Sequence, residues 1–223
     1  MKTLKFALIG TSLALTATVA AAGQVGVVGL YEDGTALNDA AVAELGCDVQ
    51  REGLIFAAQG ELSPRLRQPG QFVVLDCDQS VLTLAERRNA VSALFTDGEA
   101  IAVFEGDLTD FQAPGDEDEV RERQYILKLG YYNNRDTDGR EVALSTLDEK
   151  ASQLDGHWTN EAYLNVQDAM GIPTPDEVVV IHYENAEVAE SFRNSNSDIL
   201  RDVGAFNDAH LTAFTYLVGT AVR

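Results

Sequence analysis

The feature that most constrains this chain is a pattern of strands and helices that occurs twice along it. Val25 corresponds to Tyr125, Phe72 to Val178 and Val103 to Thr215, so the offset between the copies grows only from 100 to 112 residues. Residue identity between the copies is poor, but the same element order at nearly constant spacing indicates an internal duplication. The fold is therefore expected to contain two similar halves.

Each half is expected to run strand, helix, strand, strand, helix, strand. In the first half, the predicted strands are 24–31, 54–62, 72–77 and 100–105, and the predicted helices are 38–49 and 80–95. In the second half, the predicted strands are 124–132, 157–166, 177–183 and 211–218, and the predicted helices are 140–154 and 186–200. This order is that of a ferredoxin-like unit, an antiparallel sheet with both helices on one face.

The other face of each predicted sheet is apolar and needs a partner, which the second unit supplies. We therefore expect an α+β fold in which two tandem ferredoxin-like β-α-β-β-α-β units, residues 23–112 and 124–223, pack sheet to sheet as a pseudo-dimeric α/β barrel. Residues 113–123 are acidic and include Pro114, which is typical of a linker between units.

The first 22 residues have the pattern of a secretory signal peptide. Lys2 and Lys5 supply the positive start, an apolar stretch follows, and Ala20 to Ala22 before Gly23 give a small-residue cleavage site. No later stretch approaches twenty apolar residues, so we expect no membrane attachment after cleavage. The sequence predicts a periplasmic or secreted protein.

The acidity of the chain excludes several partners. Without Lys2 and Lys5, 36 acidic residues face 14 basic ones, a formal charge of −22. Such a surface repels nucleic acid and anionic lipid headgroups, because neither finds a basic patch. A saline habitat explains the acidity more simply than a specific cationic ligand does.

Cys47 and Cys77 are the only cysteines. An even number of cysteines in an exported chain predicts a disulfide between them. A nucleophilic cysteine is the alternative, but neither residue lies in a motif that would activate it.

Two strand-to-helix junctions carry a resemblance to a known superfamily. The segment from Phe72 to Ser80, and the segment from Val178 to Ala186 followed by Ala189 to Phe192, are similar to those of the dimeric α/β-barrel superfamily. Its members normally assemble the barrel from two chains, and include oxygenases, isomerases, haem enzymes and proteins without assigned activity. The resemblance implies a barrel around a small-molecule site, with homo-oligomerisation as a further option.

Strand alternation predicts which polar groups meet inside such a barrel. If Cys77 faces the helices, Asp76 faces the space between the sheets, and His182 occupies the matching position in the second half. Asp76 and His182 are therefore the candidate catalytic acid and base. Lys128 interrupts an apolar strand and is a candidate for orienting the substrate. Strand ends that are solvated or hydrogen-bonded are the plainer explanation for Asp76 and His182, and a solvent-exposed position on the strand is the alternative for Lys128.

Further candidates for substrate binding are polar and aromatic. His157, Trp158 and Asn160 form the densest such cluster, and Tyr216 lies in the last predicted strand. Such groups can line a pocket for a planar ligand. An edge strand with its Trp covering the sheet end is the plainer interpretation.

Metal and cofactor sites have weaker support. His157, His182 or His210 could ligate a haem, as happens in some members of the superfamily, but without Cys-x-x-Cys-His the haem would be non-covalent. Asn134 to Gly139 resembles the start of a calcium loop, but the twelfth position is Ser145 instead of Glu. We therefore expect no metal and no cofactor.

These observations lead to three alternatives for function. The first is an exported protein that binds a small organic molecule and acts as a cofactor-independent oxygenase or isomerase. The second is a non-catalytic periplasmic binding or interaction protein, and the third is a non-covalent haem-binding protein. The common motifs for nucleotide binding and hydrolysis, such as Gly-x-Gly-x-x-Gly and Gly-x-Ser-x-Gly, do not occur.

Overall fold

The computed structural model describes residues 25–34, 36–60, 66–110 and 117–223. Their elements, in chain order, are β1 (Val25–Tyr31), α1 (Asp39–Glu44), β2 (Cys47–Gly60), β3 (Gln71–Cys77), α2 (Ala85–Ser92), β4 (Ala100–Asp110), α3 (Glu117–Glu122), β5 (Gln124–Tyr132), α4 (Thr137–Ser152), β6 (Thr159–Met170), β7 (Glu177–Tyr183), α5 (Ala186–Ser195), α6 (Ser197–His210) and β8 (Leu211–Ala221). The expected signal peptide lies outside the described residues.

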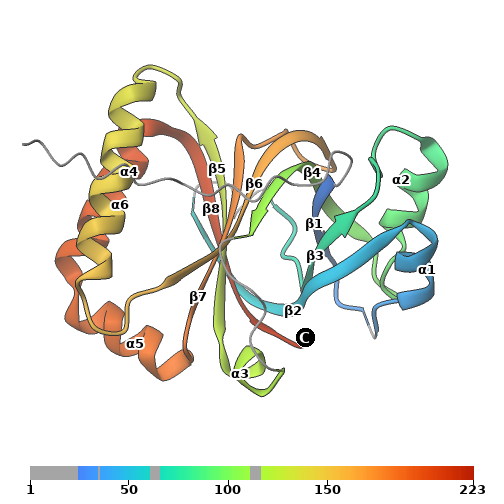
Figure 1. The fold of residues 1–223 in the computed structure, drawn as a ribbon, viewed down its shortest axis with the longest axis horizontal. Coiled ribbons are helices and arrows are strands. Elements are labelled where there is room, and N and C mark those ends of the chain that lie inside the picture. The colour runs from blue at the N-terminus through green and yellow to red at the C-terminus, as the bar shows by residue number, and fades with distance from the viewer. Residues whose placement is uncertain (1–24, 35, 61–65, 111–116) are drawn as a thin grey trace, which may run out of the picture.

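The eight strands form one closed antiparallel barrel in the order β1-β3-β2-β8-β5-β7-β6-β4 (Figure 1). The fold class expected from the sequence, two ferredoxin-like units packed sheet to sheet, is therefore wrong. Strands of the first half pair directly with strands of the second, β2 with β8 and β4 with β6. These two seams replace two separate sheets with a single continuous one, because hydrogen bonding across the halves satisfies the strand edges.

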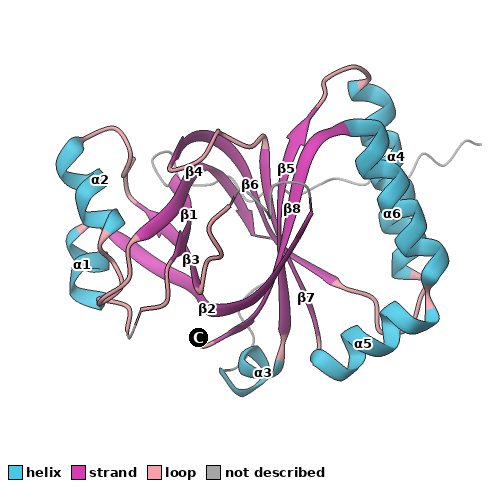
Figure 2. Ribbon diagram, turned by 180° about the vertical axis from the view of Figure 1, so that it is seen from behind, coloured by secondary structure: helices cyan, strands magenta, loops and turns pink. Residues whose placement is uncertain are grey.

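The helices lie outside the barrel in two groups (Figure 2). In both views, α1 and α2 lie on one side, and α4, α5 and α6 lie on the other. The segment expected to be a linker contains α3, which leads into β5 at one end of the barrel. The division into units 23–112 and 124–223 stays a prediction.

The barrel interior is filled by side chains that alternate along the strands. Val28, Phe72, Tyr125, Leu127 and Val178 belong to this core and are fully buried. Val120 of α3 joins the same cluster. Because the interior is closely packed, we expect a small-molecule site at the surface or the ends of the barrel and not inside it.

A second apolar cluster packs the outer face of the first half against its helices. Val73, Leu75 and Cys77 of β3 contact it from the sheet, and Val42 contacts it from α1. The first helix was expected to run through Val49 but ends at Glu44, because Gly46 follows with a φ of +69°. A glycine in this left-handed conformation is a common helix terminator.

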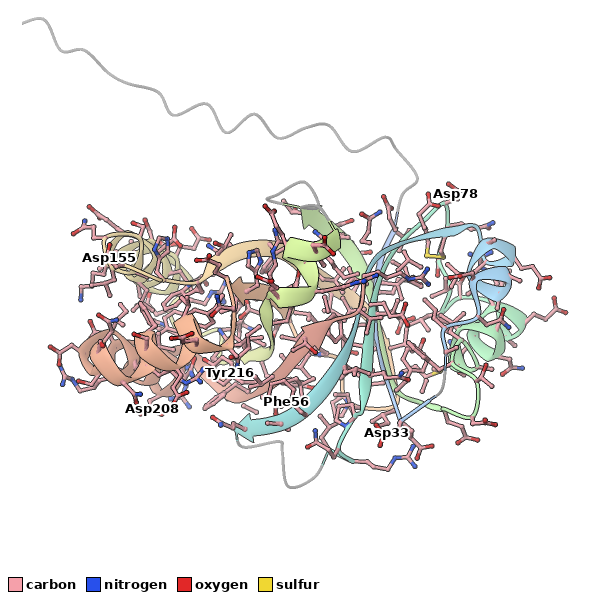
Figure 3. All side chains as sticks on the ribbon, turned by 90° about the horizontal axis from the view of Figure 1, so that it is seen from below. Asp33, Phe56, Asp78, Asp155, Asp208 and Tyr216 are labelled. Carbon is pink, nitrogen blue, oxygen red and sulfur yellow. A yellow bond between two sulfur atoms is a disulfide. The ribbon has the colours of Figure 1, made fainter. Side chains whose placement is uncertain are left out.

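The predicted disulfide between Cys47 and Cys77 is confirmed. Cys47 was expected on the first helix, but it begins β2 and lies directly opposite Cys77 of β3. The two Cα atoms are 4.0 Å apart. The yellow bond in Figure 3 marks this bridge, close to Asp78.

Two large apolar side chains remain exposed on the outer face of β2, Leu54 at 47% and Phe56 at 61%. Figure 3 shows Phe56 on the same side of the molecule as Tyr216 of β8. Assembly with a second copy stays a prediction, which substitutions of Leu54 and Phe56 can test. No helix of the described residues has the length and apolar character needed to cross a membrane.

Removing the disulfide should destabilise the protein by about 3 to 4 kcal/mol, because the bridge closes a chain segment with a sequence separation of 30 residues. The measurement is urea unfolding of the Cys47→Ala/Cys77→Ala variant beside the oxidised protein. An unchanged free energy of unfolding would show that the pairing of β2 with β3 constrains this segment without the bridge.

Candidate functional site

A group of buried charged side chains occupies the end of the barrel where β5 and β6 begin and β7 ends. Its centre is Glu161, whose side chain is only 2% exposed. Arg51 donates to Oε1 of Glu161 through Nε, and Nδ1 of His182 lies 2.7 Å from Oε2. Nη1 of Arg123 is 3.6 Å from the same Oε2. We call these four residues the Glu161 cluster.

Irregular strand pairing places two members of the cluster. In β2, Val49 pairs with Leu75 and Arg51 pairs with Val74, so Gln50 is an extra residue. This bulge turns Arg51 to the inner face, where Val74 lies. Bulges commonly redirect a side chain beside a functional site.

The second bulge supplies the carboxylate itself. In β6, Asn160 pairs with Ile181 and Ala162 pairs with Val180, so Glu161 is the extra residue. Regular pairing of β5 with β7 brings His182 opposite Tyr125 on the inner face. The cluster therefore combines Arg51 of the first half, Arg123 at the end of the expected linker, and Glu161 and His182 of the second half.

Glu161 is ionised although it is buried. Burial raises the pKa of this carboxyl group, but hydrogen bonding to His182, the charge of Arg51 and the neighbouring Tyr125 hydroxyl together hold it below its usual range. An ionised carboxylate only accepts hydrogen bonds, so Nδ1 of His182 carries a hydrogen. In the neutral ring, Nε2 then has a free lone pair.

Tyr125 adds a buried hydroxyl group to this region. Its ring lies 5.6 Å from the His182 ring, and its side chain is fully buried. The hydroxyl lies beside Glu161 and Arg123, although no hydrogen bond of regular geometry reaches it within the described residues. Burial, followed by the charge of Glu161, raises its pKa, so the group remains a proton donor at neutral pH.

A pocket of about 490 Å³ opens onto the cluster. Arg123 and His182 line it together with His157, Thr159 and Val188. The remaining lining residues are Gly156 and the exposed glutamates Glu119, Glu122 and Glu184. The pocket therefore has a basic floor and an acidic rim.

Asp76 lies at the same end of the barrel but in a different environment. It is the last inward-facing residue of β3, and it pairs with Asp48 of β2 and Gly26 of β1. Burial, then the charges of Asp48 and Asp78, raises the pKa of Asp76. No hydrogen bond or ion pair joins Asp76 to His182 within the described ranges. The structure does not bring the two expected catalytic groups together.

Lys128 and Tyr216 lie opposite each other on the outer face of the sheet. Nζ of Lys128 is 2.9 Å from Oε1 of Glu177, and the Tyr216 hydroxyl accepts a hydrogen bond from Asn207 of α6 at 2.8 Å. Tyr132 donates to the second oxygen of Glu177. Lys128 thus faces away from His182 and forms a buried ion pair under the helices.

The predicted cluster around Trp158 is divided between three environments. His157 lines the pocket, and its Nδ1 lies 2.9 Å from the Leu154 carbonyl oxygen. Trp158 packs edge-on against Phe192 of α5. Asn160 donates to Asp148 of α4 at 3.0 Å. Of these three candidates, only His157 reaches the pocket that contains His182.

The residues around the histidines do not fit a haem. A haem needs apolar walls beside its iron ligand, and Val188 is the sole aliphatic residue among those lining the pocket at His182. His210 stacks on Phe206 with ring centroids 5.0 Å apart. In the suspected calcium segment, Asp136 instead caps α4 by accepting from Gly139 at 2.9 Å. No group of three or more metal-ligating side chains occurs in the described ranges.

Sequence reasoning missed Arg51, Arg123, Tyr125 and Glu161. The segments that contain these four residues match no known motif. A prediction from strict alternation also cannot include a bulge. Only Glu161 carried a usable signal, because a charge within a predicted strand of a barrel needs a partner; Arg51 and Arg123 lie outside the predicted strands.

Comparison with known proteins identifies solved structures of similar fold. No protein-family model matches the sequence, and no curated protein matches it. An anthrone oxidase-like protein of known structure matches with a TM-score of 0.50 and 12% identity, over 89% of this chain and 93% of that chain. A mutant chlorite dismutase from Candidatus Nitrospira defluvii gives a TM-score of 0.53 at 12% identity, over 92% and 93%. The same enzyme in complex with imidazole gives 0.51 at 13%, over 90% and 92%. Such low identity establishes the fold alone.

Replacing Glu161 with Gln should lower the free energy of unfolding at pH 7 by about 3 to 5 kcal/mol, because it leaves two buried guanidinium groups without their carboxylate. Since the folded pKa of Glu161 is lowered, its contribution is complete above the unfolded value near 4.3 and is lost as the pH falls through the folded pKa. Urea unfolding from pH 7 to 3 measures both effects. Glu184→Gln, at the exposed rim, is the matched control, and an equal loss there would refute the assignment.

Replacing Asp76 with Asn should raise the free energy of unfolding at pH 7, whereas Glu161→Gln lowers it. The folded pKa of Asp76 is raised, so its ionised form opposes folding at neutral pH and ceases to do so when the group is protonated in both states. We expect a gain of roughly 0.5 kcal/mol at pH 7, since like charges face each other across the strands. The gain should vanish near pH 3 in the same unfolding measurement; a loss of stability at pH 7 would contradict it.

Proposed function

We propose that this chain, which has the fold of the dimeric α/β-barrel superfamily, is an exported protein that binds a small organic molecule and removes a proton from it. The observation that carries the proposal is the buried pair of Glu161 and His182, joined at 2.7 Å beneath an open pocket. No bound cofactor is needed for this step.

The proposed base is Nε2 of His182. The Glu161 carboxylate fixes the ring by accepting from Nδ1, so the lone pair of Nε2 is available to a ligand in the pocket. When Nε2 takes a proton, the ring becomes positively charged, and the adjacent carboxylate stabilises that charge. This division of roles between an orienting carboxylate and a histidine base is widespread in enzymes.

The substrate would be a carbon acid, with the hydrogen next to a carbonyl group. Loss of that proton gives an enolate and leaves the proton on Nε2. Return of the proton to another atom of the ligand completes an isomerisation, whereas reaction of the enolate with dissolved oxygen starts an oxygenation. Both of the expected reaction classes share the first step, and the name of the anthrone oxidase-like neighbour makes oxygen a co-substrate to test.

Export is supported by two observations of different kinds. The first residues have the pattern of a signal peptide. The disulfide between Cys47 and Cys77 is of a kind that persists in oxidising compartments. A periplasmic or secreted location is the proposal consistent with both.

A non-catalytic binding protein is the second candidate. It is favoured by the packed barrel interior, which leaves the pocket at one end of the barrel. In that case, His182 would hold Arg51, Glu161 and a ligand in place without exchanging a proton.

Replacing His182 with Gln should abolish exchange of ligand hydrogen for deuterium, because the amide cannot act as the base. The measurement is proton NMR in D₂O of a panel of small ketones, keto acids and phenols, incubated with each protein. His210→Gln, in which the altered ring packs on Phe206 away from the pocket, should keep the wild-type rate. Exchange that survives in His182→Gln would refute the base, and binding without exchange would favour the second candidate.

A further inference from the structure

The Glu161 cluster contains more positive charge than its own structure requires. Arg51 and Arg123 both approach the single carboxylate of Glu161, and His182 uses the same carboxylate through Nδ1. With a neutral His182, two guanidinium groups face one carboxylate, an excess of one positive charge. Charges withdrawn from water are normally paired, so this excess favours the binding of an anionic group.

Arg123 is the member whose hydrogen-bonding capacity is least used. Arg51 donates to Glu161 through Nε and to the Gln50 carbonyl oxygen through Nη1. The ion pair of Arg123 with Glu161, at 3.6 Å, is longer than a hydrogen bond. A guanidinium group has five donors in a planar fork. In the described part of the chain, this long ion pair and the interaction with the Tyr125 hydroxyl leave further donors of the fork for a ligand.

Arg123 is also the member that a ligand can reach. Its side chain is 13% exposed, against 7% for Arg51, and it lines the pocket beside His182. The planar fork of an arginine matches the two oxygens of a carboxylate. A carboxylate bound there would place the rest of the ligand next to the proposed base.

The rim of the pocket restricts the charge of that ligand. Glu119, Glu122 and Glu184 are exposed around the opening and line the same pocket. A second negative charge on the ligand would lie near these carboxylates and be repelled. The net charge of −20 of the whole chain acts in the same direction.

We infer that the pocket recognises a small organic monocarboxylate, whose carboxylate group binds Arg123 while a hydrogen-bearing carbon next to its carbonyl group faces His182. This inference rests on the proposed function for the role of His182. It adds the class of ligand. A monoanion is preferred over a neutral analogue, which has no carboxylate to pair with Arg123. It is also preferred over a dianion, whose second charge is repelled by the glutamates of the rim.

Calorimetric titration with three related probes tests the recognition. The probes are 2-oxobutanoate, its neutral amide 2-oxobutanamide, and the dianion 2-oxoglutarate, which all carry hydrogens next to the keto group. We expect 2-oxobutanoate to bind at least tenfold more tightly than either of the others. Equal affinity for the amide, or tighter binding of the dianion, would overturn the inference.

Variants of Arg123 assign the effect to a residue. Arg123→Gln should weaken 2-oxobutanoate at least tenfold and leave the affinity for the amide unchanged, and Arg123→Lys should give an intermediate loss because it keeps the charge without the fork. Arg121→Gln alters the other arginine of this segment, which donates to the Val222 carbonyl oxygen and does not line the pocket. Its affinities should equal those of the wild type, and a loss as large as that of Arg123→Gln would overturn the assignment. Thermal unfolding of each variant identifies any that fail to fold, in which case Arg123→Lys decides.

The same probes separate this inference from the proposed catalysis. His182→Gln should still bind 2-oxobutanoate but should not exchange its C3 hydrogens for deuterium. Binding without exchange in the wild type would uphold the inference and refute the base. Exchange of the amide, together with no preference for 2-oxobutanoate, would uphold the base and refute the inference.

Discussion

The hydrogen bonds that join β2 to β8 and β4 to β6 are the interaction on which the rest of this structure depends. They convert eight strands from two similar halves into a closed barrel, so no strand edge is left to pair with another molecule. They also bring Arg51 of the first half into contact with Glu161 and His182 of the second. The candidate site is therefore a property of the closed barrel, because neither half contains it alone.

Two groups of buried charges in the described part of the chain illustrate different uses of charge. Lys128 and Glu177 balance one another under the helices, and Tyr132 satisfies the second carboxylate oxygen. The Glu161 cluster lacks such a balance and opens to solvent on one side. Buried ion pairs contribute little net stability, so the unbalanced cluster is better explained by recognition of a ligand than by the needs of folding.

Regular parts of the chain were predictable from the sequence, and irregular parts were not. Alternation in β3 and β7 is regular, and the faces of Val74 and His182 follow from it. The disulfide follows from the cysteine number and from the signal-peptide pattern of the first residues. Closure of the barrel does not, because pairing between β2 and β8 depends on residues far apart in the sequence, with no local pattern to mark it.

The site was predictable only in part for the same reason. His182 lies in a regular strand and was identified, whereas Arg51 and Glu161 are placed by bulges that break the alternation. Lys128 interrupts an apolar strand and was expected to orient the substrate. Its position one residue out of phase with Tyr125 and Leu127 places it on the outer face, and that phase separates it from the base.

The bulge in β6 has a consequence for how such proteins diversify. Glu161 is an additional residue between two that keep their normal pairing. Its deletion would leave a regular strand, with Asn160 outside and Ala162 inside, and would remove the carboxylate that orients His182. Gain or loss of one codon at this point thus separates a barrel with an oriented histidine from a barrel without one, while the surrounding core stays the same. Chemistry on this scaffold can therefore arise by insertion as readily as by substitution.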